Sequence, residues 1–136
     1  MEKTLVLIKP DGIKRRLVGE IISFYERKSL NIVALKMTKA NKDIVEEHYK
    51  EHKGREYYEE LIAYITQDKL IAMIIEGENV IAMIRKINGI TDPLEADMGS
   101  IRGMYGTSKQ INLVHASDSV ESSRREINIW FPEMEF

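Results

Sequence analysis

The stretch TLVLIKPDG, residues 4–12, joins an unbroken apolar run to a lysine and a tight turn. An apolar run of this length, stopped by Pro10, Asp11 and Gly12, predicts a buried strand followed directly by a turn. No glycine-rich turn follows this strand, and neither G-x-G-x-x-G nor G-x-x-x-x-G-K-[ST] occurs elsewhere in the chain. Any phosphate-binding site would therefore have to use side chains rather than a glycine-rich cradle.

The hydrophobic periodicity predicts four strands alternating with helices. The expected strands are Thr4–Ile8, Ile32–Met37, Leu70–Ile75 and Ile111–Val114. Helical spacing occupies residues 18–25, 43–66 in two pieces around Gly54, 80–87 and 120–131. Residues 89–110 lose this periodicity and are rich in Gly, Pro, Asp, Ser and Thr, which indicates a long irregular segment of the kind that often carries function.

The alternation of strands and helices is compatible with two fold classes. A parallel doubly wound sheet would give the same order, but four short strands are few for that fold and its glycine-rich turn is missing. We therefore expect an α+β sandwich of the βαββαβ type. The 136 residues contain no repeat or linker, so a single domain spanning residues 1–136 is expected.

Composition excludes several kinds of chemistry. The chain has no cysteine, so disulfides, thiol catalysis and cysteine-bound metal are ruled out. A net charge of −2, from 20 basic and 22 acidic residues, argues against nucleic acid as the main partner. No apolar run is long enough for a membrane span, and the N-terminus lacks signal-peptide features, so a cytoplasmic protein without a membrane partner is expected.

The stretch NLVHASDS, residues 112–119, brings one histidine to the end of an expected strand and the start of an expected helix. A histidine beside apolar residues is more often structural than reactive. Here, however, His115 precedes a helix N-terminus, where free N–H groups favour anions, and a neutral imidazole can act as a nucleophile. Asp118 with Glu121 fits a capping pattern, which accounts for the carboxylate but not for the histidine.

Dispersed cations and a second histidine pair are the other candidates. Lys9, Arg55, Arg85 and Arg102 would suit a polyphosphate if they converged, although isolated arginines are usually solvated and sequence spacing cannot show convergence. His48 and His52 stand four residues apart, but they lack the H-E-x-x-H order and a third ligand. We therefore expect that pair to lie on a solvated helix face.

The segment NLVHASDSVESSRREI, residues 112–127, resembles the signature N-x-x-H-G-S-D-x-x-x-S-A-x-x-E-I of the nucleoside diphosphate kinase family. The segments LIKPDG, LVGEII, EHYKEHKGR, EGENV, ITDP and GSIRG match the same family in order, from about residue 3 to residue 132. So long an ordered set is far more specific than any single motif.

The resemblance implies a ferredoxin-like βαββαβ sandwich with a four-stranded antiparallel sheet and additional helices. It also implies ping-pong transfer of the γ-phosphoryl group from a nucleoside triphosphate to a nucleoside diphosphate through a phosphohistidine, with Mg²⁺ carried on the nucleotide phosphates and no metal ligands from the protein. Broad base tolerance and a homo-oligomer are expected, a hexamer rather than a tetramer.

The site residues implied by the resemblance fall into three groups. His115 is the nucleophile and Ser117 and Glu126 support its imidazole, with Lys9 and Tyr49 also catalytic. Contacts to phosphates and ribose are expected from Lys9, Tyr49, Arg55, Arg85, Thr91, Arg102 and Asn112, and base packing from Tyr57 and Leu61. Pro93 falls in a loop that shapes a subunit interface in the family.

Three positions depart from the family pattern. Ala116 replaces a glycine, which would cost about 1 kcal/mol if the backbone had positive φ. Tyr57 stands where phenylalanine is usual, and Ser123, in place of alanine, is expected to bond back to the preceding helical turn. Two alternatives stay open, a non-catalytic nucleotide- or nucleic-acid-binding regulatory protein on the same scaffold and a small ligand-sensing domain. The presence of His115, Lys9 and the arginines favours the enzyme.

Overall fold

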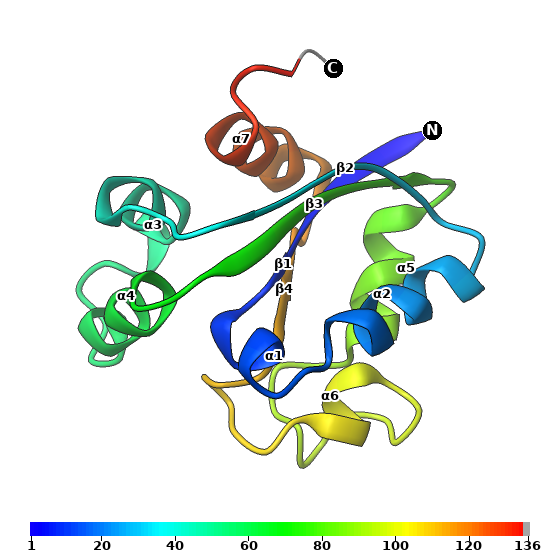
Figure 1. Ribbon diagram of the computed structural model, residues 1–136, viewed down its shortest axis with the longest axis horizontal. Helices are drawn as coiled ribbons and strands as arrows, with labels where there is room; N and C mark the ends of the chain where they lie inside the picture. The colour runs from blue at the N-terminus through cyan, green and yellow to red at the C-terminus, as the bar shows by residue number, and fades with distance from the viewer. Residues whose placement is uncertain (135–136) are drawn as a thin grey trace.

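The protein is described by a computed structural model covering residues 1–134. Four strands, β1 (Glu2–Ile8), β2 (Asn31–Thr38), β3 (Leu70–Gly77) and β4 (Val114–Ala116), form one sheet in the order β2-β3-β1-β4 (Figure 1). Every neighbouring pair is antiparallel. This order confirms the ferredoxin-like βαββαβ fold.

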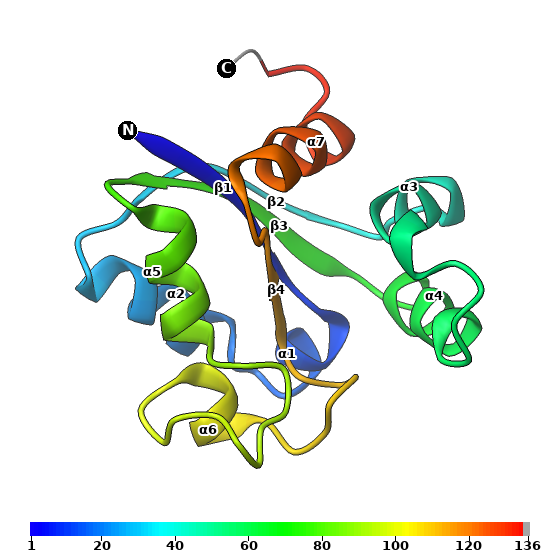
Figure 2. The same ribbon diagram turned by 180° about the vertical axis from the view of Figure 1, so that it is seen from behind.

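Helices cover both faces of the sheet (Figures 1 and 2). They are α1 (Pro10–Lys14), α2 (Val18–Arg27), α3 (Lys42–His48), the 3₁₀ turn η1 (Lys50–His52), α4 (Tyr58–Thr66), α5 (Val80–Asn88), α6 (Ile101–Tyr105) and α7 (Val120–Trp130). Helices α2 and α5 pack on one face, and α3, α4 and α7 lie toward the other. The predicted interruption of residues 43–66 is confirmed, because Gly54 has a φ of +93° between α3 and α4.

The two faces of the sheet carry separate hydrophobic cores. In β1, Leu5 and Leu7 join the core beneath α3, α4 and α7, whereas Val6 and Ile8 join the core beneath α2 and α5. Strand β3 alternates in the same way, and all four of these β1 residues are fully buried. A strand covered on both faces has no polar side, which explains the unbroken apolar run in the sequence.

The fourth strand begins later than the sequence indicates. The expected strand Ile111–Val114 is wrong, because pairing with β1 starts only at Val114 and continues to Ala116. Leu113 has a φ of +77°, and its backbone N–H donates to Asp11 Oδ2 at 3.1 Å rather than to a strand. This local bend redirects the chain toward the sheet.

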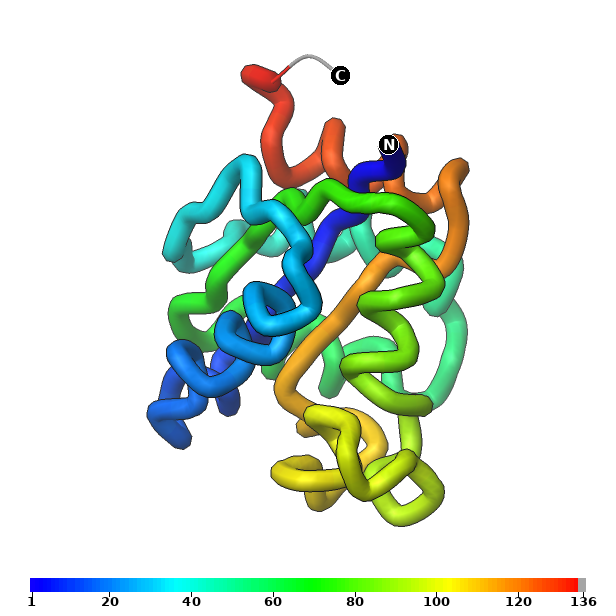
Figure 3. Tube along the Cα trace, turned by 90° about the vertical axis from the view of Figure 1, so that its right-hand side faces the viewer, coloured from blue at the N-terminus to red at the C-terminus, as the bar shows by residue number. Residues whose placement is uncertain are grey.

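Two short helices were not expected. Helix α1 occupies the turn after β1, and α6 lies within residues 89–110. That segment lies at the opposite end of the sheet from α7 (Figure 3). None of the helices in residues 1–134 is long and apolar enough to cross a membrane.

Candidate active site

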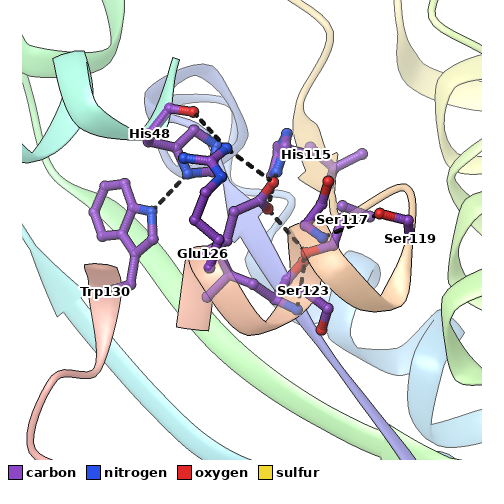
Figure 4. Close-up of polar contacts among 12 residues, drawn as sticks. His48, His115, Ser117, Ser119, Ser123, Glu126 and Trp130 are labelled. Atoms are coloured by element: carbon purple, nitrogen blue, oxygen red, sulfur yellow. Dashed lines mark hydrogen bonds and ion pairs between the residues drawn. The ribbon is translucent and has the colours of Figure 1, made fainter. Parts of the chain in front are cut away.

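The imidazole of His115 is held from one side. His115 lies in β4 opposite Leu7, and its Nε2 is 2.7 Å from Glu126 Oε1, which also accepts a hydrogen bond from Ser117 Oγ at 2.8 Å (Figure 4). Among the described residues, no hydrogen-bond partner of His115 Nδ1 is present. The expected support from Glu126 and Ser117 therefore leaves Nδ1 free to react.

Helix α7 brings Glu126 to this position. Its N-cap is Ser119, whose side chain accepts from Ser122 N at 3.0 Å, so the cap lies one residue after the expected Asp118. Ser123 donates to the Lys3 carbonyl of β1 at 2.5 Å, which corrects the expectation that it bonds back along its own helix. That hydrogen bond ties α7 to β1 and so helps to position Glu126 beside His115.

His48 belongs to the site, although the sequence placed it on a solvated helix face. It is 4% exposed, and its ring centroid lies 4.4 Å from that of His115 and 4.5 Å from that of Tyr49. Trp130 Nε1 donates to His48 Nδ1 at 2.9 Å (Figure 4). Burial lowers the pKa of His48 well below its usual range, so the ring is neutral.

The cationic side chains predicted to contact phosphates come from different elements, and each is oriented by its own hydrogen bonds. Lys9, directly after β1, donates to Asn112 Oδ1 at 2.8 Å. Arg102 of α6 donates to the carbonyls of Gly89 at 2.6 Å and Val114 at 2.5 Å. Arg85 of α5 donates to a third carbonyl, that of Ala116, at 3.3 Å. Carbonyls orient these groups without neutralising their charge.

Burial and the neighbouring cations lower the pKa values of two groups in the site. Burial, reinforced by Arg102, lowers the pKa of Lys9 to about 7. Burial, followed by the nearby Lys9, Arg102 and Arg85, lowers the pKa of His115 to about 3. The histidine is therefore neutral near pH 7 and faces a field that attracts anions.

A cavity of about 520 Å³ collects most of the predicted residues. It is lined by Lys9, Tyr49, Tyr57, Leu61, Arg85, Thr91, Arg102, Asn112, His115 and Glu126. Ser117 is fully buried behind Glu126, and Arg55 is exposed in the turn before α4, outside the lining. The lining residues that sequence reasoning missed are His48, Glu51, His52, Lys109, Gln110, Val114, Ala116, Asp118, Ser122 and Arg125.

Ala116 fits its position without strain. It lies in β4 in extended backbone and is not among the described residues with positive φ. The methyl group is 7% exposed and packs in the core beneath α2 and α5. The possible cost of replacing glycine beside the histidine therefore does not arise.

Three side chains lie close enough together to coordinate a metal ion. The ligand atoms of His48, His115 and Glu126 lie within 4.8 Å of one another, and they are the one such group in residues 1–134. Two imidazoles and a carboxylate suit zinc better than Mg²⁺, which prefers oxygen ligands. The neighbouring lysine and arginines favour an anion there instead.

A neutral imidazole with one free nitrogen, facing a cationic cavity, suits acceptance of a phosphoryl group. Fold and site together are those expected of a phosphotransferase that binds anionic substrates.

Comparisons with known proteins specify the family. The family model described as nucleoside diphosphate kinase matches residues 2–136. A nucleoside diphosphate kinase of Saccharolobus islandicus is 51% identical over 131 residues, which span 96% of this chain and 95% of the relative. The chain therefore belongs to the nucleoside diphosphate kinase family, and it is an enzyme that transfers phosphoryl groups between nucleotides, a reaction that needs a divalent metal.

Solved structures agree with this assignment. The apo nucleoside diphosphate kinase from Encephalitozoon cuniculi has a TM-score of 0.95 and 37% identity, covering 96% of this chain and 89% of that one. A halophilic nucleoside diphosphate kinase from Halobacterium salinarum, solved in complex with CDP, has a TM-score of 0.93 and 36% identity, covering 96% and 87%.

Proposed function

We propose that His115 carries the phosphoryl group in a ping-pong exchange between a nucleoside triphosphate and a nucleoside diphosphate. The observation that carries this proposal is the free Nδ1 of a neutral imidazole whose Nε2 is bound to Glu126. In the first half-reaction Nδ1 forms a bond to the γ-phosphorus, the bond from that phosphorus to the bridging oxygen breaks, and the nucleoside diphosphate leaves. The second half-reaction reverses these steps with another diphosphate.

Glu126 supports this exchange through the opposite ring nitrogen. Attack by Nδ1 makes the ring cationic while Nε2 keeps its proton, and a carboxylate 2.7 Å away stabilises that charge. Ser117 donates to the same carboxylate oxygen and holds it in place. The pair therefore orients the imidazole and favours the charge that develops during transfer.

The cations stabilise the transferred group. Charge spreads over the phosphoryl oxygens in the transition state, and oriented cations in a buried cavity act strongly on it. We assign this role to Lys9, Arg85 and Arg102, with Tyr49, Thr91 and Asn112 as further phosphate and ribose contacts. Asn112 also fixes Lys9 through their 2.8 Å hydrogen bond. Arg55 is exposed and lies outside the cavity lining, so we assign it a more distant contact with the phosphates.

Tyr57 and Leu61 form the side of the cavity that we assign to the base. An aromatic ring and an apolar side chain hold any base by its face, and this gives little discrimination between bases. The CDP bound to the Halobacterium salinarum relative supports a nucleotide with a pyrimidine base as one substrate. We expect purine and pyrimidine diphosphates to be accepted alike.

The metal is proposed to be Mg²⁺, brought in on the nucleotide phosphates. Mg²⁺ prefers oxygen ligands and is commonly bound through substrate phosphates. The trio of His48, His115 and Glu126 does not offer that set. The metal belongs to the substrate, and the protein contributes the surrounding cations.

The remaining assignments concern the chain as a whole. We propose that residues 1–136 act as a single kinase domain in the cytoplasm, in a homo-oligomer for which a hexamer is preferred over a tetramer. Leu35 and Met37, each about half exposed on the edge strand β2, support association. Pro93 and the 87% exposed Leu94 support a second contact in the loop before α6.

The experiment separates the two half-reactions. The protein is incubated with Mg²⁺ and ATP labelled on the γ-phosphate, without acceptor, and the isolated labelled protein is then mixed with GDP. Acid-labile label on the chain and its quantitative transfer to GDP are expected, and His115→Ala should carry none. Label that survives in His115→Ala would contradict the mechanism, and a regulatory nucleotide-binding protein would acquire no label.

A further inference from the structure

The wall assigned to the base contains a tyrosine whose hydroxyl already has a partner. Tyr57 Oη lies 2.5 Å from His52 Nδ1, and the two rings meet edge to face with centroids 5.7 Å apart. The His52 ring also meets Tyr49 edge to face, with centroids 5.9 Å apart. Both His52 and Tyr57 are half-buried and line the cavity. Their contact is therefore part of the cavity wall.

The backbone around Tyr57 offers little to fix its side chain. Between α3 and α4 the regular structure is limited to the three residues of η1, and Gly54 has a left-handed φ of +93°. Tyr57 directly precedes α4, and its side chain makes no cap bond to that helix. Tyr57 packs against the core beneath α3, α4 and α7, and the hydrogen bond to His52 is the polar restraint that sets the direction of its hydroxyl and ring edge.

A free hydroxyl at this position would also affect selectivity. A phenol both donates and accepts, and bases differ in the amino and carbonyl groups at their edges. A polar group that bonds some bases and is left unpaired by others discriminates between them. The bond to His52 uses the donor or the acceptor capacity of the hydroxyl and holds the group toward His52, which leaves the ring face, and all bases can use that face.

We propose that His52 is a positioning residue for nucleotide binding, which fixes the Tyr57 ring as a flat platform and prevents its hydroxyl from selecting among bases. This inference rests on the proposed function, because it concerns the same site and substrates. It assigns no bond-making step to His52, so the effect falls on KM and on the spread of KM among bases rather than on kcat.

The test measures kcat and KM for ADP, GDP, CDP and UDP with His52→Ala, His52→Asn, Tyr57→Phe and the double variant His52→Ala with Tyr57→Phe. Removing one neutral hydrogen bond should raise KM about threefold to tenfold in His52→Ala, with kcat within about twofold. The four KM values should also diverge by about threefold or more in that variant. Asn places its Oδ1 near the position of Nδ1, so His52→Asn should keep values close to those of the original protein.

The tyrosine variants separate the two effects. Tyr57→Phe should raise KM without spreading the four values, and the double variant should behave like Tyr57→Phe, because the hydroxyl that discriminates is gone. Lys53→Ala, an exposed neighbour outside the cavity lining, is the matched control and should change neither quantity.

Three results would overturn the inference. They are unchanged KM values in His52→Ala, a loss of kcat with KM unchanged, and a spread among bases that persists in the double variant. If His52→Ala does not fold, an unchanged KM in Tyr57→Phe is equally decisive. Labelling from γ-labelled ATP is measured alongside, because absent label in the original protein contradicts the proposed function, whereas normal label with unchanged KM contradicts only the role of His52.

Discussion

At the scale of single residues, the site depends on how each charged or polar group is compensated. The carboxylate on Nε2 orients the ring of His115, and burial together with the nearby Lys9, Arg102 and Arg85 lowers its pKa and keeps it neutral. Lys9 has an amide oxygen as its direct partner and Arg102 nearby, which leaves its ammonium poorly compensated. A bound polyphosphate would supply the missing negative charge.

Nucleotide binding should therefore take up a proton at Lys9. With a pKa of about 7, this side chain is mostly neutral at pH 8 in the free protein. Adjacent phosphates raise the pKa again, so close to one proton is absorbed on binding at pH 8, and affinity increases as the pH falls from 9 toward 7. Calorimetry of Mg-ADP binding in two buffers of different ionisation enthalpy measures this uptake.

Lys9→Met provides the control for that measurement, because it keeps the length of the side chain without the titrating group. It should bind more weakly and show no buffer-dependent enthalpy. The same pKa predicts that Lys9 makes the nucleotide-free protein more stable as the pH rises from about 7 toward 10, since the unfolded lysine holds its proton to about 10.4. Equal binding enthalpies in both buffers for the unaltered protein would contradict the assignment.

At the scale of elements, the site is assembled where strands and helices end. Lys9 follows β1, Arg102 lies in α6, and His115 occupies a strand of only three residues. Gly89 ends α5 with a φ of +86°, and its carbonyl accepts from Arg102 Nη1. The turn after α5 thus determines where the Arg102 guanidinium points.

Gly89→Ala should therefore impair both stability and nucleotide binding. A Cβ at this position would clash with Ser100 Oγ, in a backbone conformation that alanine disfavours, so a loss of about 1–3 kcal/mol is expected. The displaced Arg102 should raise KM for nucleotides. Gly99→Ala, where a Cβ meets nothing within 4 Å, should stay within about 0.5 kcal/mol.

Urea unfolding and steady-state kinetics of the two glycine variants provide the comparison. Equal stability and equal KM for Gly89→Ala and Gly99→Ala would show that the turn does not position Arg102.

Local patterns predicted the elements better than their ends. The apolar run of Thr4–Ile8 and the break at Gly54 follow from short-range spacing, and the structure confirms them. Glu126 was predicted from the family resemblance, and in the structure it lies on α7 with its Oε1 2.7 Å from His115 Nε2. The start of β4 could not be predicted, because the bend at Leu113 is stabilised by Asp11, about a hundred residues earlier. Such long-range bonds leave no signal in the local sequence.

Among the site residues, the same limit separates His115 from His48. His115 stands in a motif that resembles the family signature and also contains Ser117 and Glu126, so its proposed role could be predicted from the sequence. His48 is buried by Trp130 and His115, far along the chain, and its spacing from His52 suggested only an exposed helix face. The hydrogen bond from Ser123 Oγ to the Lys3 carbonyl could not be predicted for the same reason.

At the scale of the whole molecule, the sheet separates two cores, and residues from α3, α4, α5, α6, β4 and α7, with Lys9 directly after β1, line one cavity. Some large apolar side chains belong to neither core and are exposed on the surface. Leu35 and Met37 are about half exposed on β2, while Leu94 and Met98 are 87% and 86% exposed. Two separate apolar regions favour an assembly larger than a dimer.

Light scattering coupled to size-exclusion chromatography should therefore give a mass about six times the 15.7 kDa of one chain. Leu94→Asp, which places a charge in the loop before α6, should reduce this mass by weakening one of the two contacts, since an unpaired buried charge is costly. A monomeric mass for the unaltered protein at micromolar concentration would contradict the proposed association.

We propose that Nδ1 of His115, rather than Nε2, carries the phosphoryl group, because Nε2 is bound to Glu126. The direct test labels the protein from γ-labelled ATP with Mg²⁺, hydrolyses it in alkali, where phosphohistidine survives, and separates the two phosphohistidine isomers by chromatography. Label in the isomer phosphorylated on Nδ1 is predicted. Label in the Nε2 isomer, or on a hydroxyl residue such as Ser117, would contradict transfer through Nδ1.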